Sequence, residues 1–386
     1  MKRALTAVAV ILAVATAAGL AILWPGDPEA RIGGGLTVES QNAEVVEVRE
    51  TTCPGLGGQK CQLIAARIES GPEEGRTAQL QLNASGLDPD LDPGDGIRVT
   101  KAPEPPPGQE GIAGPAYSFY DFQRGQPMLV LALIFAAIVL LFARMRGALS
   151  LAGLAFSLAL VLLFVVPAIL DGKPPLAVAI VGALAVALIT IPLAHGTGPK
   201  SLAALLGTAA SLMLTALLAL AFTKAAHLTG LSSEEGAFLQ LAGANLSLQG
   251  LLLAGMVIGA LGVLDDVTVS QSSTVLALRA ANPALRFREL FAMAMRVGRD
   301  HVSATVNTLV LAYVGASLPV LLIFSSADLG LGEALGTELV AKEVVATLVG
   351  SIGLIAAVPL TTALAAALAL GEEPSALAGE EHGHAH

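Results

Sequence analysis

The sequence has few charged residues for its length. Of its 386 residues only 13% are charged, whereas 54% are hydrophobic, and the mean hydropathy is +0.72. A soluble domain does not need so much apolar surface, so the composition predicts an integral membrane protein. The net charge of −10 says little about binding partners, because the acidic residues concentrate in one N-terminal segment.

Several functional signatures are also missing. Aromatic residues make up only 4% of the chain, and the basic residues form no long patch with them, which argues against a nucleic-acid-binding surface. The chain has no HExxH, GxSxG or GxxxxGK[ST] motif, so the common signatures of zinc proteases, serine hydrolases and P-loop proteins are absent. We therefore expect neither an enzyme nor a cofactor. An intramembrane hydrolase that uses Asp265 and Asp300 is the catalytic alternative, but both acids are expected at the membrane interface.

Cysteine is scarce as well. The two cysteines, Cys53 and Cys61, form no CxxC pair, so a structural zinc site is not supported. They bracket a glycine-rich loop in a segment that we expect to be exported. A disulfide between them is favoured over free thiols in that environment.

The first stretch, Met1–Leu23, carries Lys2 and Arg3 and then continues as an uninterrupted apolar run. Its apolar run of about 20 residues is long enough to cross a bilayer. We favour an uncleaved signal anchor over residues 1–25, because the run is long for a signal peptide, although a cleaved signal peptide has a similar pattern. In both interpretations the residues that follow are exported from the cytoplasm.

Residues 26–126 form the soluble-looking part of the chain. Alternating or β-branched stretches separated by turn residues predict a small exported β domain, with an OB-type barrel as one form it could take. The expected strands are Leu36–Glu47, Cys61–Glu69, Ala78–Leu82 and Ile97–Lys101. Ala102–Pro115 is rich in proline and is expected to be a tether.

Apolar segments dominate residues 127–371, which we interpret as a seven-helix transmembrane domain. The expected spans are Met128–Ala143, Leu149–Leu170, Leu176–Ala194, Leu202–Phe222, Leu248–Leu264, Val306–Phe324 and Val344–Leu370. With the first helix this makes about eight, and the fold class is an all-α polytopic membrane protein with a small β domain. Residues 372–386 are expected to be a disordered cytoplasmic tail, with weak metal binding by its histidines as the alternative.

The short loops predict the orientation. If eight spans are counted, most of the basic residues between them fall on one side, which the positive-inside rule assigns to the cytoplasm. Both termini are then cytoplasmic, and the β domain lies outside. The basic stretch Ala284–Arg299 lies on the inner side. It is either an interfacial helix or an ordinary basic loop, and Arg286, Arg288 and Arg296 are candidates for contact with anionic lipid.

One stretch combines apolar and polar residues unusually. Gly255–Pro283 starts as a membrane-type helix and then presents Asp265 and Asp266, followed by hydroxyls and amides. On a helix Asp266, Ser270 and Ser273 share one face. The acids either mark the end of a span or line a polar cavity, since carboxylates at the edge of hydrocarbon are costly.

A second polar element is Val297–Pro319. Asp300, Ser303 and Asn307 recur there at helical spacing and line one face. Because both polar segments face the same membrane level, we predict that Asp265 or Asp266 meets Asp300 and Asn307 in one pocket open to the cytoplasm. Asn307 either bonds a neighbouring helix or contacts a substrate. Thr208, Ser211 and Thr215 repeat the spacing in another span, where close helix packing is the favoured interpretation.

Three ordered motifs carry a resemblance to a known family. GVLDDVTVSQSS, GRDHVSATVNTLVLAYVGASLP and EVVATLVGSIGLIAAVPLTT, within about Pro127–Leu370, resemble the YibE/F family of bacterial membrane proteins. The resemblance implies a multi-pass protein of the bacterial cytoplasmic membrane, sometimes called permease-like, but supplies no catalytic assignment. The positions that match its motifs are Asp265, Arg299, Asp300, Asn307, Tyr313, Pro319 and Glu343.

These features favour transport of a small, unidentified solute or ion, because the motif-bearing spans place acids at both faces and amides between them. The alternative is a binding or assembly factor that acts through its exported β domain and uses the spans as an anchor. The pathway residues of the transport hypothesis are Asp265, Asp266, Ser270, Ser273, Arg299, Asp300, Asn307, Tyr313 and Glu343.

Overall fold

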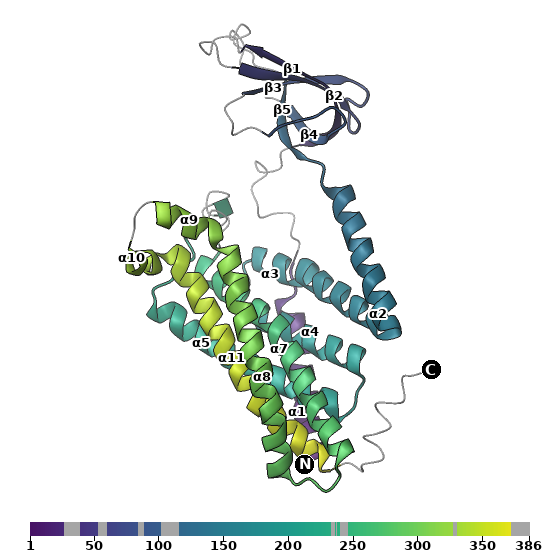
Figure 1. The fold of residues 1–386 in the computed structure, drawn as a ribbon, viewed down its shortest axis with the longest axis vertical. Helices are drawn as coiled ribbons and strands as arrows, with labels where there is room; N and C mark the ends of the chain where they lie inside the picture. The colour runs from purple at the N-terminus through teal and green to yellow at the C-terminus, as the bar shows by residue number, and fades with distance from the viewer. Residues whose placement is uncertain are drawn as a thin grey trace. The chain divides into compact units, whose positions relative to one another are not determined.

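The computed structural model describes residues 1–26, 39–52, 60–83, 89–101, 116–232, 236, 238–239, 246–326 and 330–371. The described chain is mostly helical, with one small antiparallel sheet (Figure 1). It divides into two compact units. The first comprises Met1–Gly33 and Val139–His386, and the second is Gly34–Ile138. The tail 372–386 and the proline-rich tether lie outside the described residues.

The second unit contains the sheet, whose order is β3-β2-β1-β4-β5 with antiparallel neighbours. The strands are β1 (Ser40–Thr52), β2 (Lys60–Ile68), β3 (Thr77–Asn83), β4 (Gly96–Lys101) and β5 (Tyr117–Phe122). Alternate residues such as Val45, Ile64, Leu80 and Ile97 are buried in its core, as the period of two requires. The predicted β domain is therefore confirmed.

Two details of this sheet differ from the prediction. The first strand lies further along the chain than expected and contains a bulge between Val45 and Glu47, and β5 was not predicted at all. The edge strands β3 and β5 lie near each other, but no ladder joins them among the described strands. An OB-type barrel thus stays a prediction.

The disulfide also stays a prediction. Cys61 is fully buried on β2, and its sulfur accepts a hydrogen bond of 3.3 Å from Gln81 Nε2. No described cysteine is a free thiol. Cys53 lies outside the described residues.

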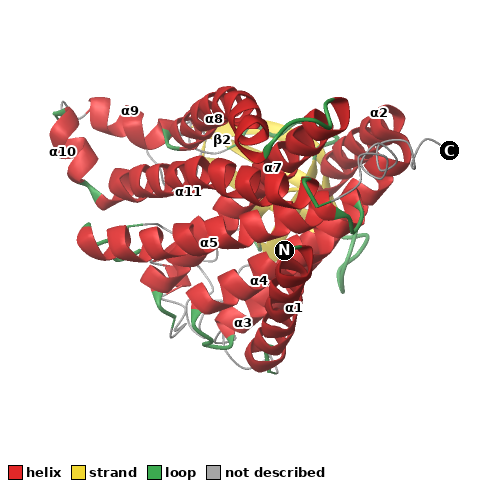
Figure 2. Ribbon diagram, turned by 90° about the horizontal axis from the view of Figure 1, so that it is seen from below, coloured by secondary structure: helices red, strands yellow, loops and turns green. Residues whose placement is uncertain are grey.

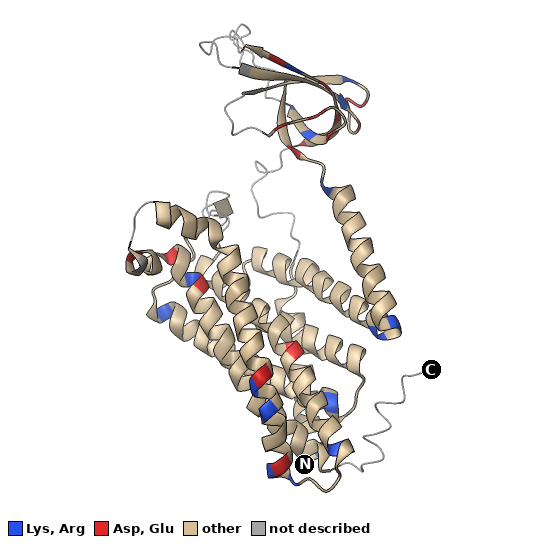
Figure 3. Cartoon of the chain, in the orientation of Figure 1, with Lys and Arg blue, Asp and Glu red and all other residues tan. Residues whose placement is uncertain are grey.

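The helices of the first unit pack side by side, as Figures 1 and 2 show. Their bounds are α1 (Lys2–Leu23), α2 (Gly125–Leu160, which begins in the second unit), η3 (Val161–Val165), α3 (Val166–Leu170), α4 (Pro175–His195), α5 (Pro199–Ala225), α7 (Leu248–Ala281), α8 (Phe287–Ala316), α9 (Leu318–Ser326), α10 (Leu331–Gly336) and α11 (Glu338–Ala369). Charged residues are few on most of these helices, but several lie in the first half of α8 (Figure 3).

Six of the described helical segments are long and apolar enough to cross a membrane, or seven if α8 and α9, which meet at a bend of 59°, form one span. The expected eight spans are not established. One of the six segments, Gly125–Leu170, contains two of the predicted spans. Arg144 interrupts it with a positive φ of 50°, so α2 comprises two helices that meet at this residue.

Two helices are longer than predicted. The span Leu248–Leu264 does not end at the acidic pair, because α7 continues through it to Ala281. At 34 residues α7 is about 51 Å long, which exceeds a hydrocarbon core of about 30 Å. The basic stretch after it is neither a separate interfacial helix nor a loop, because from Phe287 onward it belongs to α8, which runs unbroken to Ala316.

The centre of the bundle is formed by α5, α7 and α11, which pack through small and hydroxyl-bearing residues. A Cβ on Gly353 of α11 would collide with the Thr215 hydroxyl of α5, and a Cβ on Gly207 would collide with that of Thr361. Thr208 and Thr268 share a hydrogen bond of 2.6 Å between α5 and α7. Close helix packing is thus the role of Thr208 and Thr215, as expected.

The first helix is part of the bundle. The rings of Trp24 and Phe164 lie 5.7 Å apart, and a Cβ on Gly19 would approach Val181 to 2.7 Å. The Gly26 amide donates a long hydrogen bond, 3.4 Å, to Asp171 Oδ2. These contacts attach α1 to η3, to α4 and to the residue that follows α3.

Candidate functional site

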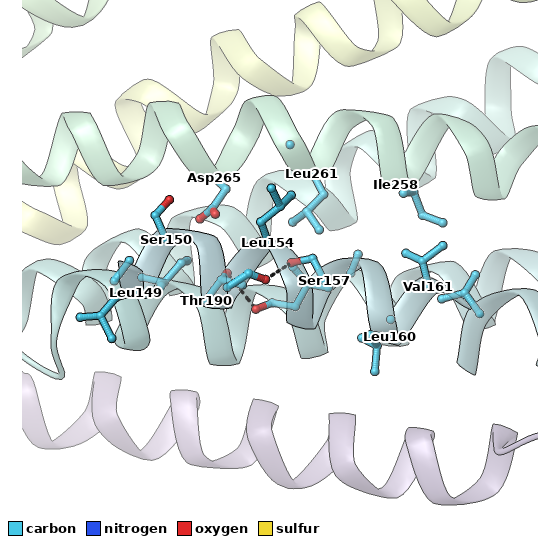
Figure 4. A pocket seen from close by; sticks show the side chains of 18 of the residues that line it. Leu149, Ser150, Leu154, Ser157, Leu160, Val161, Thr190, Ile258, Leu261 and Asp265 are labelled. Atoms are coloured by element: carbon cyan, nitrogen blue, oxygen red, sulfur yellow. Dashed lines mark hydrogen bonds between the residues drawn. The ribbon is translucent and has the colours of Figure 1, made fainter. Parts of the chain in front are cut away.

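The bundle contains a cavity of about 410 Å³ between the second half of α2, η3, α4 and α7. Most of its lining is aliphatic. The exceptions are Ser150 and Ser157 of α2, Thr190 and His195 of α4, and Asp265 of α7. In Figure 4 the Asp265 carboxylate points from α7 toward the helices that carry Ser150 and Thr190. We call this space the Asp265 cavity.

Asp265 is placed here by helix periodicity. Ile258, Leu261 and Gly262 precede it by seven, four and three residues and line the same cavity, as residues on one helical face do. Its Oδ1 atom is buried and has no hydrogen-bond partner among the described residues. An unpaired carboxylate among apolar side chains is costly. The cavity therefore offers a strong acceptor position for a cation or a proton.

The other polar groups of the cavity are largely satisfied within their own helices. Ser157 Oγ donates to the Gly153 carbonyl and Thr190 Oγ1 to the Val186 carbonyl, each at 2.9 Å (Figure 4). A Cβ on Gly153 would lie 3.5 Å from Thr190 Cγ2, so the glycine lets α2 and α4 approach closely. The wall opposite Asp265 is hence hydroxyl-bearing but uncharged.

A second, wider cavity of about 1020 Å³ adjoins the first and shares Ser150, Ala194 and His195 with it. We call it the vestibule. Its lining includes Arg146, the α4–α5 loop Gly196–Gly198, Lys200, and Ser273 of α7. Asp265 lines the first cavity and Ser273 the second, so the buried acid and the basic vestibule lie on either side of the shared residues.

A different face of α7 carries Ser270 and Asp266. Ser270 Oγ lies 3.3 Å from His301 Nδ1 of α8, whereas Asp266, one turn earlier, is exposed. The side chains of the two adjacent acids therefore lie in different surroundings, because consecutive residues of a helix point about 100° apart. His301 was not singled out from the sequence.

The remaining predicted residues lie on α8 and α11. Asp300 and Asn307 are exposed, and Arg299 Nε donates to the Met295 carbonyl of its own helix at 3.2 Å. Tyr313 is half-buried, with its hydroxyl next to Gly259 of α7. Glu343 lies 3.9 Å from Lys342 Nζ.

Of the predicted pathway residues, Asp265 and Ser273 line the two cavities. Asp266, Ser270, Arg299, Asp300, Asn307, Tyr313 and Glu343 line neither. The meeting of Asp265 or Asp266 with Asp300 and Asn307 in one pocket stays a prediction. The sequence analysis missed Ser150, Ser157, Thr190 and His195, which are isolated polar residues in apolar spans. Each supplies a single polar group, so only the packing of three helices reveals them as a set.

Comparison with known proteins gives one match. A family model described as "YibE/F-like protein" matches residues 131–371, which include both cavities. No curated protein and no solved structure matches the chain.

Proposed function

The chain belongs to the YibE/F-like family, and we propose that this membrane protein moves a small solute or ion along the vestibule and the Asp265 cavity. The observation that carries the proposal is the buried Oδ1 of Asp265, which has no partner among the described residues and lies in a cavity that shares lining residues with the vestibule. Ionisable groups within apolar spans are expensive and usually belong to ion or substrate pathways.

Asp265 acts in this proposal as the group that binds and releases a cation or proton. A carboxylate in a mostly aliphatic cavity favours a bound positive charge over isolation. The hydroxyls of Ser150, Ser157 and Thr190 line the same space, and their oxygens can accept hydrogen bonds from a passing solute or its water. Proton binding at Asp265 also suits coupling to an ion gradient.

The test uses purified protein in liposomes that contain a pH-sensitive dye. With an imposed pH gradient, the parent protein is expected to carry protons, and Asp265→Asn to reduce the flux to the level of empty liposomes. Asp266→Asn is the matched control, because it makes the same chemical change at an exposed neighbour outside both cavities. Equal loss in both variants, or normal flux in Asp265→Asn, would contradict a role for the Asp265 cavity.

A second proposal is that the chain is a binding or assembly factor. It is favoured by the separate unit Gly34–Ile138, which has a hydrophobic core of its own. The unit would recognise a protein or envelope component, and the helices would hold it at the membrane. In that case a complementation assay would tolerate Asp265→Asn but not disruption of the sheet, for example by Val99→Asp in the buried core.

A further inference from the structure

The charged residues of the vestibule are of one sign. Its lining includes Arg146 and Lys200, and no Asp or Glu of the described chain contributes to it. His195 lies near both of these cations and, like Ser150, lines both the vestibule and the Asp265 cavity. A concave site lined by one sign of charge concentrates ions of the opposite sign. The vestibule is therefore an electrostatic trap for anions, although the neighbouring cavity contains an acid.

The backbone of the vestibule adds donors suited to the same ligand. The loop Gly196–Gly198 lines it and leads directly into the 27-residue helix α5, which has Pro199 at its first position and no side-chain cap. The first N–H groups of a helix have no partner within it, and its dipole favours an anion. Gly196 adopts a φ of +78°, a conformation that glycine reaches without strain. The helix start thus reinforces a site that the lining cations define.

We propose that the vestibule binds a phosphate group. An arginine can hold two phosphate oxygens at once, and a lysine adds a point charge. Arg146 and Lys200 come from different helices and line one cavity, so a single tetrahedral anion can engage both. The Thr197 hydroxyl and the glycine backbone supply neutral donors to the remaining oxygens.

This inference deepens the proposed function, on which it rests, by naming the chemical class of the solute. The shared residues Ser150, Ala194 and His195 separate the vestibule from Asp265, so the anion and the carboxylate occupy different spaces. A phosphate that enters the vestibule would neutralise its cations, while a proton at Asp265 would neutralise the acid. Two sources have this chemistry: free phosphate and the headgroup of an anionic phospholipid.

The experiment measures binding by the full-length protein at constant ionic strength. In the first arm, radiolabelled inorganic phosphate is titrated against the protein in phosphatidylcholine nanodiscs. In the second, a short-chain phosphatidylglycerol is added in detergent, and bound lipid is counted by native mass spectrometry. The variants are Lys200→Gln and Arg146→Gln, with Arg49→Gln as control, because it removes an exposed arginine charge on β1, outside the vestibule and outside the helical unit. Thermal unfolding confirms that each variant is folded, and Arg146, which is exposed, provides a usable variant if Lys200→Gln does not fold.

The proposal is supported if binding is saturable, weakens about tenfold or more in both vestibule variants, as expected for loss of a charge-assisted hydrogen bond, and stays intact in Arg49→Gln. The arm in which this occurs identifies the source of the phosphate. Absence of saturable binding in both arms, or equal weakening in Arg49→Gln, overturns the proposal. Binding needs no flux, so phosphate binding without proton flux would refute only the proposed function. Flux without phosphate binding would refute only this inference.

Discussion

Gln271 of α7 donates a hydrogen bond of 2.7 Å to Thr362 Oγ1 of α11. The same amide nitrogen donates at 3.0 Å to the Ala294 carbonyl of α8, so one buried side chain joins three helices. Gly298 makes room for it, because a Cβ there would lie 2.9 Å from Gln271 Oε1. Thr362 in turn donates to the Val358 carbonyl at 2.6 Å. A polar side chain within the bundle core thereby positions α8 against α7 and α11.

We predict that Gln271→Leu destabilises the bundle by about 1–3 kcal/mol, because the buried partners lose a donor and the site is fully desolvated. The measurement is reversible unfolding in mixed detergent, followed by circular dichroism. Gln126→Leu is the control, since Gln126 is exposed. Equal stability of the parent and Gln271→Leu would show that the amide makes no net contribution to the free energy of unfolding.

A second prediction concerns the contact between α5 and α11. Gly353→Ala should lower the free energy of unfolding by about 1–3 kcal/mol, the usual cost of overpacking, because the new methyl group meets the Thr215 hydroxyl. Gly255→Ala, on α7, should have little effect, because nothing lies within 4 Å of that position.

Thr215→Ala provides a direct check on the cause. It removes the colliding hydroxyl, so the double variant with Gly353→Ala should be less destabilised than the sum of the two single variants. Strict additivity of the two changes would contradict the proposed collision.

The sheet is expected to lose stability in acid through Glu73. The hydrogen bond from Tyr117 and then the one from Lys101, whose Nζ lies 3.1 Å from Glu73 Oε1, lower the pKa of Glu73 below its usual value of 4.5. A lowered folded-state pKa stabilises the fold above the unfolded-state pKa, and the effect disappears as the pH falls through the folded-state value.

Glu73→Gln should therefore reduce the pH dependence of the free energy of unfolding of the second unit below about pH 4.5. Fluorescence of the labelled second unit in the intact protein, titrated with denaturant at several pH values, measures this. Glu74→Gln serves as the control, since it makes the same chemical change at the neighbouring, exposed acid. Identical pH profiles for the parent and Glu73→Gln would refute the assignment.

We also predict that α1 remains attached in the mature protein, in line with the signal-anchor interpretation. Contacts with Phe164, Val181 and Asp171 hold α1 and the residues that follow it against the bundle, as expected for a helix that stays with the protein. Intact-mass analysis of protein purified from membranes should give a chain that includes residues 1–23. A mass that corresponds to a start after Leu23 would contradict this prediction.

The sequence by itself determined the membrane class, the family and the positions of most helices. These properties are local: an apolar run long enough to cross a bilayer is recognisable without its neighbours, and the family motifs are contiguous. The β domain was predicted for the same reason, because apolar and polar residues alternate within single strands such as Ala78–Leu82. The strand β5 was missed because it follows the proline-rich stretch that was interpreted as a tether.

Only the tertiary structure decided where α7 ends and which way its acids point. The polar run after Asp265 looked like the end of a span, but Thr268, Gln271 and Ser272 are buried. Neighbouring helices supply hydrogen-bond partners for Thr268 and Gln271, and the Ser272 hydroxyl donates to a carbonyl of its own helix, so α7 can continue. Likewise, the Asp265 cavity needs two polar residues from α2 and two from α4, far away in the chain. Isolated polar residues in apolar helices leave no local pattern, so the site exists only once the helices pack.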